Sequence, residues 1–141
     1  LRAMMQRRYT HNPDDKPPPE PPPLTEEMKQ DIHPCGAGQT SCCIDSYGNV
    51  HPCAAIDTVL GNLRKERFAD IWHNSEELER IRSIRLSDLP ECGSCDLFLP
   101  CNRCAGLAKM ETGSLLGRPS QCCEVTYAME GFYREKRCEL F

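Results

Sequence analysis

Eleven cysteines dominate this chain of 141 residues, and ten of them lie between positions 35 and 123. They form an early group and a late group. The early group consists of Cys35, Cys42, Cys43 and Cys53, and the late group of Cys92, Cys95, Cys101, Cys104, Cys122 and Cys123. Adjacent side chains in an extended segment point to opposite faces, so one member of each adjacent pair is expected to serve a given site. Eight thiolates then remain, which is enough for two sites of four cysteines each.

The rest of the composition favours a domain that needs bound metal. Apolar residues make up 39% of the chain and only nine residues are aromatic, against a usual apolar share of about 45–50%, so the core is thin. No signal-peptide stretch is present, which predicts a cytoplasmic protein whose cysteines bind metal rather than form disulfides. The net charge of −4 does not indicate the basic surface that binds nucleic acid. No apolar run reaches the length of a membrane span, and the chain is too short for a complete (β/α)₈ barrel.

The spacing of the late cysteines favours iron–sulfur clusters over zinc. Structural zinc sites commonly separate their two Cys-x₂-Cys pairs by about 15–20 residues, whereas only five residues separate Cys95 from Cys101. A cluster is wider than a single ion, and in two-cluster ferredoxins the fourth cysteine of a compact run serves the other cluster. Thiolates suit zinc and iron–sulfur clusters equally well by softness, so zinc stays open as the alternative.

Three segments are expected along the chain. Residues 1–34 contain no cysteine and include a proline-rich run at 17–23, which predicts a semi-rigid linker or, alternatively, a ligand for a proline-recognising domain. A short helix is predicted over 24–31, capped by Thr25. Residues 35–125 form the functional domain, and residues 126–141 continue a C-terminal helix.

Within the functional domain we expect a small α+β fold stabilised by metal clusters: a short β-hairpin, then helices and cysteine-rich loops. The hairpin spans 41–51, with its turn at Gly48. Gly61-Asn62 is predicted to be another turn. The pattern predicts helices at 63–72 and from Ser75 onward, then loops over 92–123 and a helix from about Gln121.

These cysteines and their surroundings resemble the SPASM domain, the C-terminal extension of many radical S-adenosylmethionine enzymes. Residues 35–53 read Cys-x₁₂-Gly-x₄-Cys, and residues 92–104 read Cys-x₂-Cys-x₅-Cys-x₂-Cys. The segment Cys-Asn-Arg-Cys-Ala-Gly at 101–106 is also similar. One departure is the two residues, rather than the family's three, between the last two cysteines of the run. The resemblance implies a SPASM/twitch-like fold.

The resemblance further implies two auxiliary clusters, usually [4Fe–4S]. By position, the first cluster would take Cys35, Cys42, Cys53 and Cys104. The second would take Cys92, Cys95, Cys101 and Cys123. Cys43 and Cys122 remain the alternatives within the two adjacent pairs. Some relatives leave one iron of the first cluster without a cysteine, so Cys42 is alternatively a bystander.

The family's radical chemistry uses a Cys-x₃-Cys-x₂-Cys loop on a partial barrel, and this sequence has no Cys-x₃-Cys. We therefore expect residues 1–34 to be the end of a missing barrel that binds S-adenosylmethionine, or the chain to be a free-standing protein that meets a barrel in trans. Either way, it should hold no catalytic residue and be inactive alone. The implied partner is a peptide or protein substrate, which the clusters serve by relaying electrons or by positioning it.

The alternative is a structural, zinc- or cluster-stabilised module that docks peptides without a redox role. Two further residues are candidates for contact with a metal site. Arg103, between two cysteines of the late run, is either a charge that offsets thiolates or an ordinary surface arginine. His51, two residues before Cys53, is the one histidine placed to support a ligand.

Overall fold

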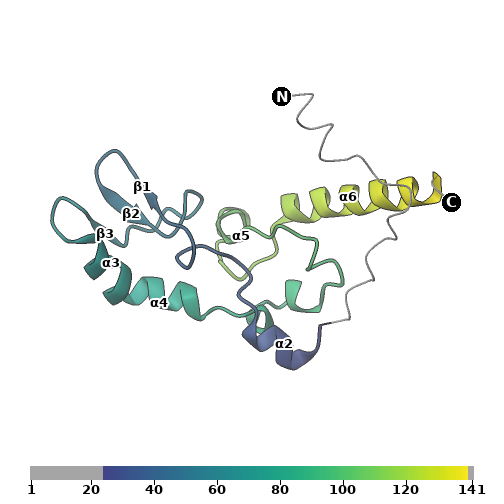
Figure 1. The fold of residues 1–141 in the computed structure, drawn as a ribbon, viewed down its shortest axis with the longest axis horizontal. Coiled ribbons are helices and arrows are strands. Elements are labelled where there is room, and N and C mark those ends of the chain that lie inside the picture. The colour runs from purple at the N-terminus through teal and green to yellow at the C-terminus, as the bar shows by residue number, and fades with distance from the viewer. Residues whose placement is uncertain (1–23, 140–141) are drawn as a thin grey trace, which may run out of the picture.

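The computed structural model describes residues 24–139, so the proline-rich run at 17–23 lies outside the described residues (Figure 1). The first element is the helix α2, Glu26–Asp31. The Thr25 hydroxyl accepts a hydrogen bond from the Met28 backbone N–H at 3.2 Å, which satisfies one of the donors left free at a helix start. The predicted helix and its cap are confirmed.

A three-stranded antiparallel sheet follows, in the order β1 (Cys43–Ile44), β2 (Asn49–His51) and β3 (Gly61–Asn62). The predicted hairpin is confirmed, and Gly48 in its turn has φ 86°, a conformation that glycine adopts without steric cost. The prediction of a turn at Gly61-Asn62 is wrong, because these residues pair with Val50 and Asn49 of β2. This pairing joins distant residues, and local sequence does not report it.

Two helices continue from the sheet: α3 (Phe68–Asn74) and α4 (Glu76–Ser83). The predicted start of α3 at position 63 is wrong, because Asn62 holds the next residues in a turn. Its side-chain oxygen accepts from the Arg64 N–H at 2.9 Å, and its carbonyl accepts from the Lys65 N–H at 2.9 Å. Such local bonds compete with a helix. Ser75 caps α4 as predicted, since its hydroxyl accepts from the Leu78 N–H.

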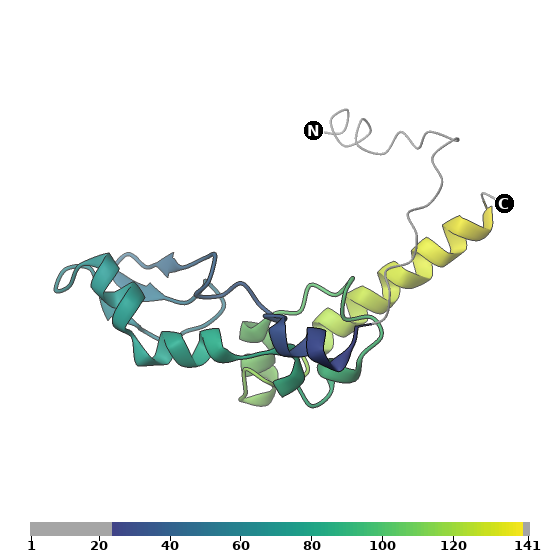
Figure 2. The same ribbon diagram turned by 60° about the horizontal axis from the view of Figure 1, so that its bottom comes forward.

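The core of the first half, formed by the sheet, α3 and α4, is small and apolar. It includes Val50 of β2, Ile71 of α3 and Leu78 of α4, all buried. Arg82 ties the helices to the first loop, because its Nε donates to the Gly38 carbonyl at 2.7 Å and its guanidinium lies 4.6 Å from the Trp72 ring. These contacts hold the sheet, α3 and α4 together at one end of the molecule (Figures 1 and 2).

The second half consists of short 3₁₀ turns, η1 (Leu86–Asp88) and η2 (Cys92–Ser94), and the helices α5 (Ala105–Thr112) and α6 (Ser120–Glu139). The prediction of loops over 92–123 is wrong where α5 lies. This helix begins at the Cys104 thiol, which accepts from the Leu107 N–H, and ends at Gly113 with φ 77°, a common left-handed C-cap. The predicted C-terminal helix is confirmed as α6, which extends away from the body (Figure 2).

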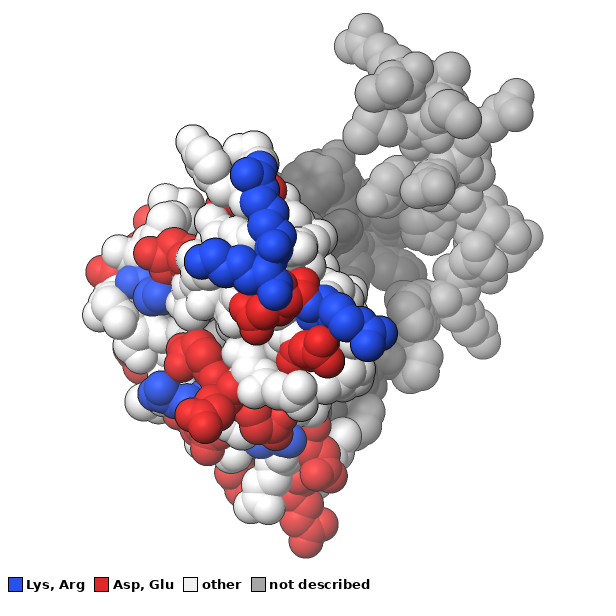
Figure 3. All heavy atoms as spheres, turned by 90° about the vertical axis from the view of Figure 1, so that its left-hand side faces the viewer, with Lys and Arg blue, Asp and Glu red and all other residues white. Residues whose placement is uncertain are grey.

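The observed architecture is a small α+β fold, as predicted. The end of the molecule that carries the sheet and α3 shows acidic and basic side chains interspersed, without a large field of one sign (Figure 3). None of the helices in the described part of the chain is long and apolar enough to cross a membrane.

Candidate metal centre

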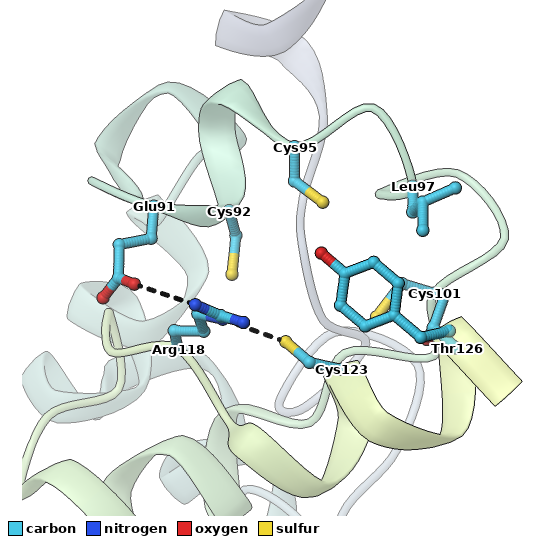
Figure 4. Close-up of a pocket in the computed structure, with 9 residues that line it drawn as sticks. Glu91, Cys92, Cys95, Leu97, Cys101, Arg118, Cys123 and Thr126 are labelled. Atoms are coloured by element: carbon cyan, nitrogen blue, oxygen red, sulfur yellow. Dashed lines mark hydrogen bonds and ion pairs between the residues drawn. The ribbon is translucent and has the colours of Figure 1, made fainter.

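Four cysteines of the late group line one cavity of about 230 Å³. These are Cys92, Cys95, Cys101 and Cys123, and their side chains are directed toward the same space (Figure 4). Three come from the run between η1 and α5, and the fourth comes from the first turn of α6. The four residues assigned by resemblance to the second cluster therefore share one site.

Consecutive tight turns explain how the run brings its cysteines to one side. The N–H of Cys95 donates to the Cys92 carbonyl at 3.2 Å, that of Phe98 to Cys95 at 3.1 Å, and that of Cys101 to Phe98 at 3.1 Å. Each bond closes a three-residue step of the kind found in 3₁₀ turns. These successive turns bring Cys92, Cys95 and Cys101 to the side of the run that lines the cavity.

Two arginines lie near the cysteines of this cavity. The Arg118 Nε donates to the Cys123 sulfur at 3.2 Å, and its Nη1 lies 3.6 Å from a Glu91 carboxylate oxygen (Figure 4). Burial raises the pKa of the Cys92 thiol, while the nearby positive charge of the Arg103 guanidinium opposes that rise. Positive charge near a thiol favours the thiolate, which is the form that binds metal.

The adjacent pair Cys122 and Cys123 divides between two surroundings. Cys123 lines the cavity, and Cys122 is not among the lining residues. Burial raises the pKa of the Cys122 thiol, and the nearby Cys104 backbone N–H opposes that rise. The pair separates because both residues lie on α6 and project around its axis in different directions.

The four residues assigned to the first cluster are less closely gathered. Cys35 and Cys53 pack against the same buried cluster, formed by Ala37, Ile56 and Ala105. Cys104, next to Ala105, caps α5 with its thiol. Cys42 is exposed, and its alternative Cys43 lies in β1 opposite His51.

The two further candidates for contact with a metal site, His51 and Arg103, lie in different surroundings. His51 is occupied within the hairpin region: its Nδ1 lies 3.1 Å from the Thr58 carbonyl, and its Nε2 lies 3.5 Å from Asp45. It therefore supports the hairpin. Arg103 is not a surface residue, because only 7% of it is exposed.

Residues outside the cysteine motif also line the cavity: Glu91, Leu97, Arg118, Thr126 and Tyr127. Sequence reasoning missed them, Arg118 above all. A basic residue five positions before a cysteine has no recognisable spacing signal. Its hydrogen bond to the Cys123 sulfur depends on how the chain enters α6, which the sequence does not show.

The cavity fits a cluster better than a single ion. Across the residues that the structure describes, no three His, Cys, Asp or Glu side chains gather closely enough to hold one metal ion. A closed zinc site brings four ligands onto one ion at about 2.0–2.3 Å, leaving no such space between them. A cavity of about 230 Å³ is several times the roughly 30 Å³ share of a water molecule. A soft, all-thiolate donor set around that space suits an iron–sulfur cluster.

Comparison with known proteins agrees with this chemistry. Residues 35–96 match the model of the SPASM family, described as an iron–sulfur cluster-binding domain. The chain is 31% identical over 93 residues to AdoMet-dependent heme synthase of Methanosarcina barkeri, covering 62% of this chain and 25% of that protein. It is 31% identical over 109 residues to mycofactocin maturase MftC of Mycobacterium tuberculosis, and the match covers 74% of this chain and 27% of that protein. It is 41% identical over 69 residues to PqqA peptide cyclase of Xanthomonas oryzae pv. oryzae, and the match covers 44% of this chain and 18% of that protein.

The chain spans about a quarter of the length of the first curated relatives that it matches. No solved structure matches it significantly. The relatives therefore bear on a region of about a hundred residues. The ten cysteines between positions 35 and 123 are free thiols.

Proposed function

Since residues 35–96 belong to the SPASM family of iron–sulfur cluster-binding domains, we propose that this chain is the auxiliary-cluster part of a radical S-adenosylmethionine maturase that acts on a peptide or protein. It binds two [4Fe–4S] clusters, the first through Cys35, Cys42, Cys53 and Cys104. The second is held by Cys92, Cys95, Cys101 and Cys123. The single observation that supports this function best is the shared cavity of the second set.

Bound clusters supply one-electron redox chemistry, whose potential depends on net charge, hydrogen bonds to sulfur and burial. The chain's own residues provide those conditions. Tight turns after Cys92 and Cys95 fix the sulfur positions, and Arg118 donates to the Cys123 sulfur. Glu91 and Tyr127 line the cavity and are themselves exposed, so a substrate can approach from this side.

The barrel that binds S-adenosylmethionine is provided either in cis, from a longer chain that includes residues 1–34, or in trans. Residues 35–125 are the cluster domain, and residues 126–141 continue α6 as its C-terminal extension. We place the protein in the cytoplasm, because open thiolate sites persist in a reducing compartment. The peptide substrate is supported by two relatives, a mycofactocin maturase and a PqqA peptide cyclase.

A second candidate differs in substrate. The relatives named AdoMet-dependent heme synthase favour a precursor of heme as the substrate in place of a peptide, with the same cluster sites. Binding of labelled hemin and of candidate precursor peptides to the cluster-loaded chain separates the two. Saturable hemin binding without peptide binding would replace the peptide proposal.

Iron analysis tests the function directly. The chain is purified without oxygen and reconstituted with iron and sulfide, and then iron, sulfide and zinc are counted. Two [4Fe–4S] clusters require about eight irons with matching sulfide and a broad visible absorption. A colourless chain with two zinc ions after reconstitution would contradict the redox proposal and leave the structural module.

A further inference from the structure

Arg103 carries a positive charge in the interior of the domain without an acidic partner. Only 7% of it is exposed. Its Nη2 donates to the Leu115 carbonyl at 2.6 Å and to the Gly117 carbonyl at 2.8 Å. Both acceptors are neutral, and the ion pairs found among the described residues do not include Arg103. A buried charge is costly unless it is paired, so this guanidinium calls for a negative neighbour.

Two donors of the same guanidinium remain unused. Nε and Nη1 are buried and have no hydrogen-bond partner within normal geometry. Buried donors are nearly always satisfied in folded proteins. The two carbonyl bonds hold one edge of the planar group, which leaves the other nitrogen atoms directed elsewhere.

The surroundings of Arg103 identify the negative neighbour. The residue lies between Cys101 and Cys104 in the chain. It lines a small cavity of about 10 Å³ together with Cys35. Its guanidinium also interacts with the Cys92 thiol, whose charged form it favours. Arg103 therefore lies near cysteines of both groups: it lines the small cavity with Cys35, and its charge acts on Cys92 of the larger cavity.

We propose that Arg103 is the internal counter-cation of the site formed by Cys92, Cys95, Cys101 and Cys123, and that its buried, unpaired charge raises the reduction potential of the cluster bound there. This inference rests on the proposed function. Four thiolates bring more negative charge than an iron–sulfur core offsets, and reduction adds one electron more. A cation held nearby in a poorly screened interior stabilises the reduced form.

Arg118 provides the matched contrast. It also contacts a sulfur of the site, but its side chain is 47% exposed and is shared with Glu91. Water and the neighbouring carboxylate screen its charge. Removing Arg118 should therefore change the potential less than removing Arg103, although both are arginines beside the same site.

The test compares reduction midpoints in the reconstituted chain. Each sample is reduced stepwise with dithionite, one electron per cluster, and the paramagnetic signal is followed. The signal of the second site is the one that Cys92→Ala lacks. Iron and sulfide are counted in every sample, so a failure of the proposed function shows as a wild-type chain without iron, separately from any change in potential.

We expect Arg103→Gln to retain iron and to shift the redox equilibrium of that site at least tenfold toward the oxidised form, which is about 59 mV for one electron. Arg103→Lys should recover at least half of the shift, and Arg118→Gln should shift it less. Arg80→Gln, which removes an exposed arginine paired with Glu77, should change nothing.

Two outcomes would overturn the inference. One is an unchanged midpoint in Arg103→Gln with full iron. The other is equal loss of the second cluster from Arg103→Gln and Arg103→Lys, since that result assigns Arg103 only to holding the 115–117 loop. If Arg103→Gln loses this cluster and Arg103→Lys keeps it, the site requires the charge, and the inference is supported.

Discussion

The two proposed cluster sites of this molecule differ in how far the fold assembles their cysteines. The late site, Cys92, Cys95, Cys101 and Cys123, places four sulfurs around one cavity. The early site, Cys35, Cys42, Cys53 and Cys104, distributes its members over an apolar cluster, a helix cap and an exposed loop position. Both sites have four assigned members, so the number of cysteines does not account for the difference.

Chain distance accounts for it. Three late ligands lie within ten residues of one another, between Cys92 and Cys101, and hydrogen-bonded turns position them. The early set must join Cys53 to Cys104, far along the chain, and closing a long loop costs more entropy than closing a short one. We infer that the late site is largely preformed and that metal binding contributes more of the ordering at the early site.

The largest expected effect comes from removing a late ligand. Cys92→Ala should lose about half of the iron, because one of two [4Fe–4S] sites fails, while the early site keeps its own. Iron and sulfide counts with the visible spectrum measure this. Cys122→Ala is the matched control, since Cys122 lies outside the cavity, and it should keep full iron. Loss of all iron from Cys92→Ala would contradict two independent sites.

The next effect should fall on the early site alone. A Cβ on Gly106 would meet the backbone carbonyl and side chain of Ala55, two residues after Cys53. Gly106→Val should therefore push α5 and Cys104 away from the Cys53 turn, and it should lower early-site iron partly while sparing the late site. The loss is partial because α5 can shift.

Gly131→Ala is the control for Gly106→Val, because nothing lies within 4 Å of a Cβ at that position. Alanine in place of glycine within a helix should stabilise α6 by about 0.5–1 kcal/mol. Thermal unfolding and iron counts measure both variants. Equal iron loss from both sites in Gly106→Val would show that the two sites do not assemble separately.

Local signals predicted the elements best. Thr25 and Ser75 cap the helices expected of them, and Gly48 forms the expected turn. The missed strand β3 exists only through pairing with β2. The missed helix α5 begins at a cysteine cap and a close Gly106 contact, neither of which is a usual helix signal.

The candidate site divides in the same way. Spacing and resemblance predicted which four cysteines would lie together, and that these bind a cluster stays a prediction. The arginines depend on tertiary contacts. Arg103 is buried because the loop that follows α5 brings the carbonyls of Leu115 and Gly117 into contact with it. Arg118 reaches the sulfur of Cys123 because that residue lies in the first turn of α6. The sequence alone does not show such tertiary contacts.

The smallest expected effect distinguishes the hairpin from the cysteine sites by the pH at which each one fails rather than by its iron content. The Asp45 carboxylate accepts from the side chain and backbone of Asn49 and from the Tyr47 N–H, at 2.8–2.9 Å. The Asn49 side-chain bond, above all, lowers the pKa of Asp45 from 3.8 to about 2. Because the folded pKa is depressed, this contribution to hairpin stability is complete above the ordinary value and disappears as the pH falls through about 2.

The cysteine sites should fail at a higher pH, because protons compete with metal for thiolates. As the pH is lowered, the visible absorption should therefore disappear while the amide signals of Tyr47 and Asn49 stay at their folded positions, and these should titrate only near pH 2. Asp45→Asn should remove that last titration and leave the pH of iron loss unchanged. If the two amides instead change together with the absorption, the hairpin depends on the clusters, and the contrast between a hydrogen-bonded region and a metal-ordered one does not hold.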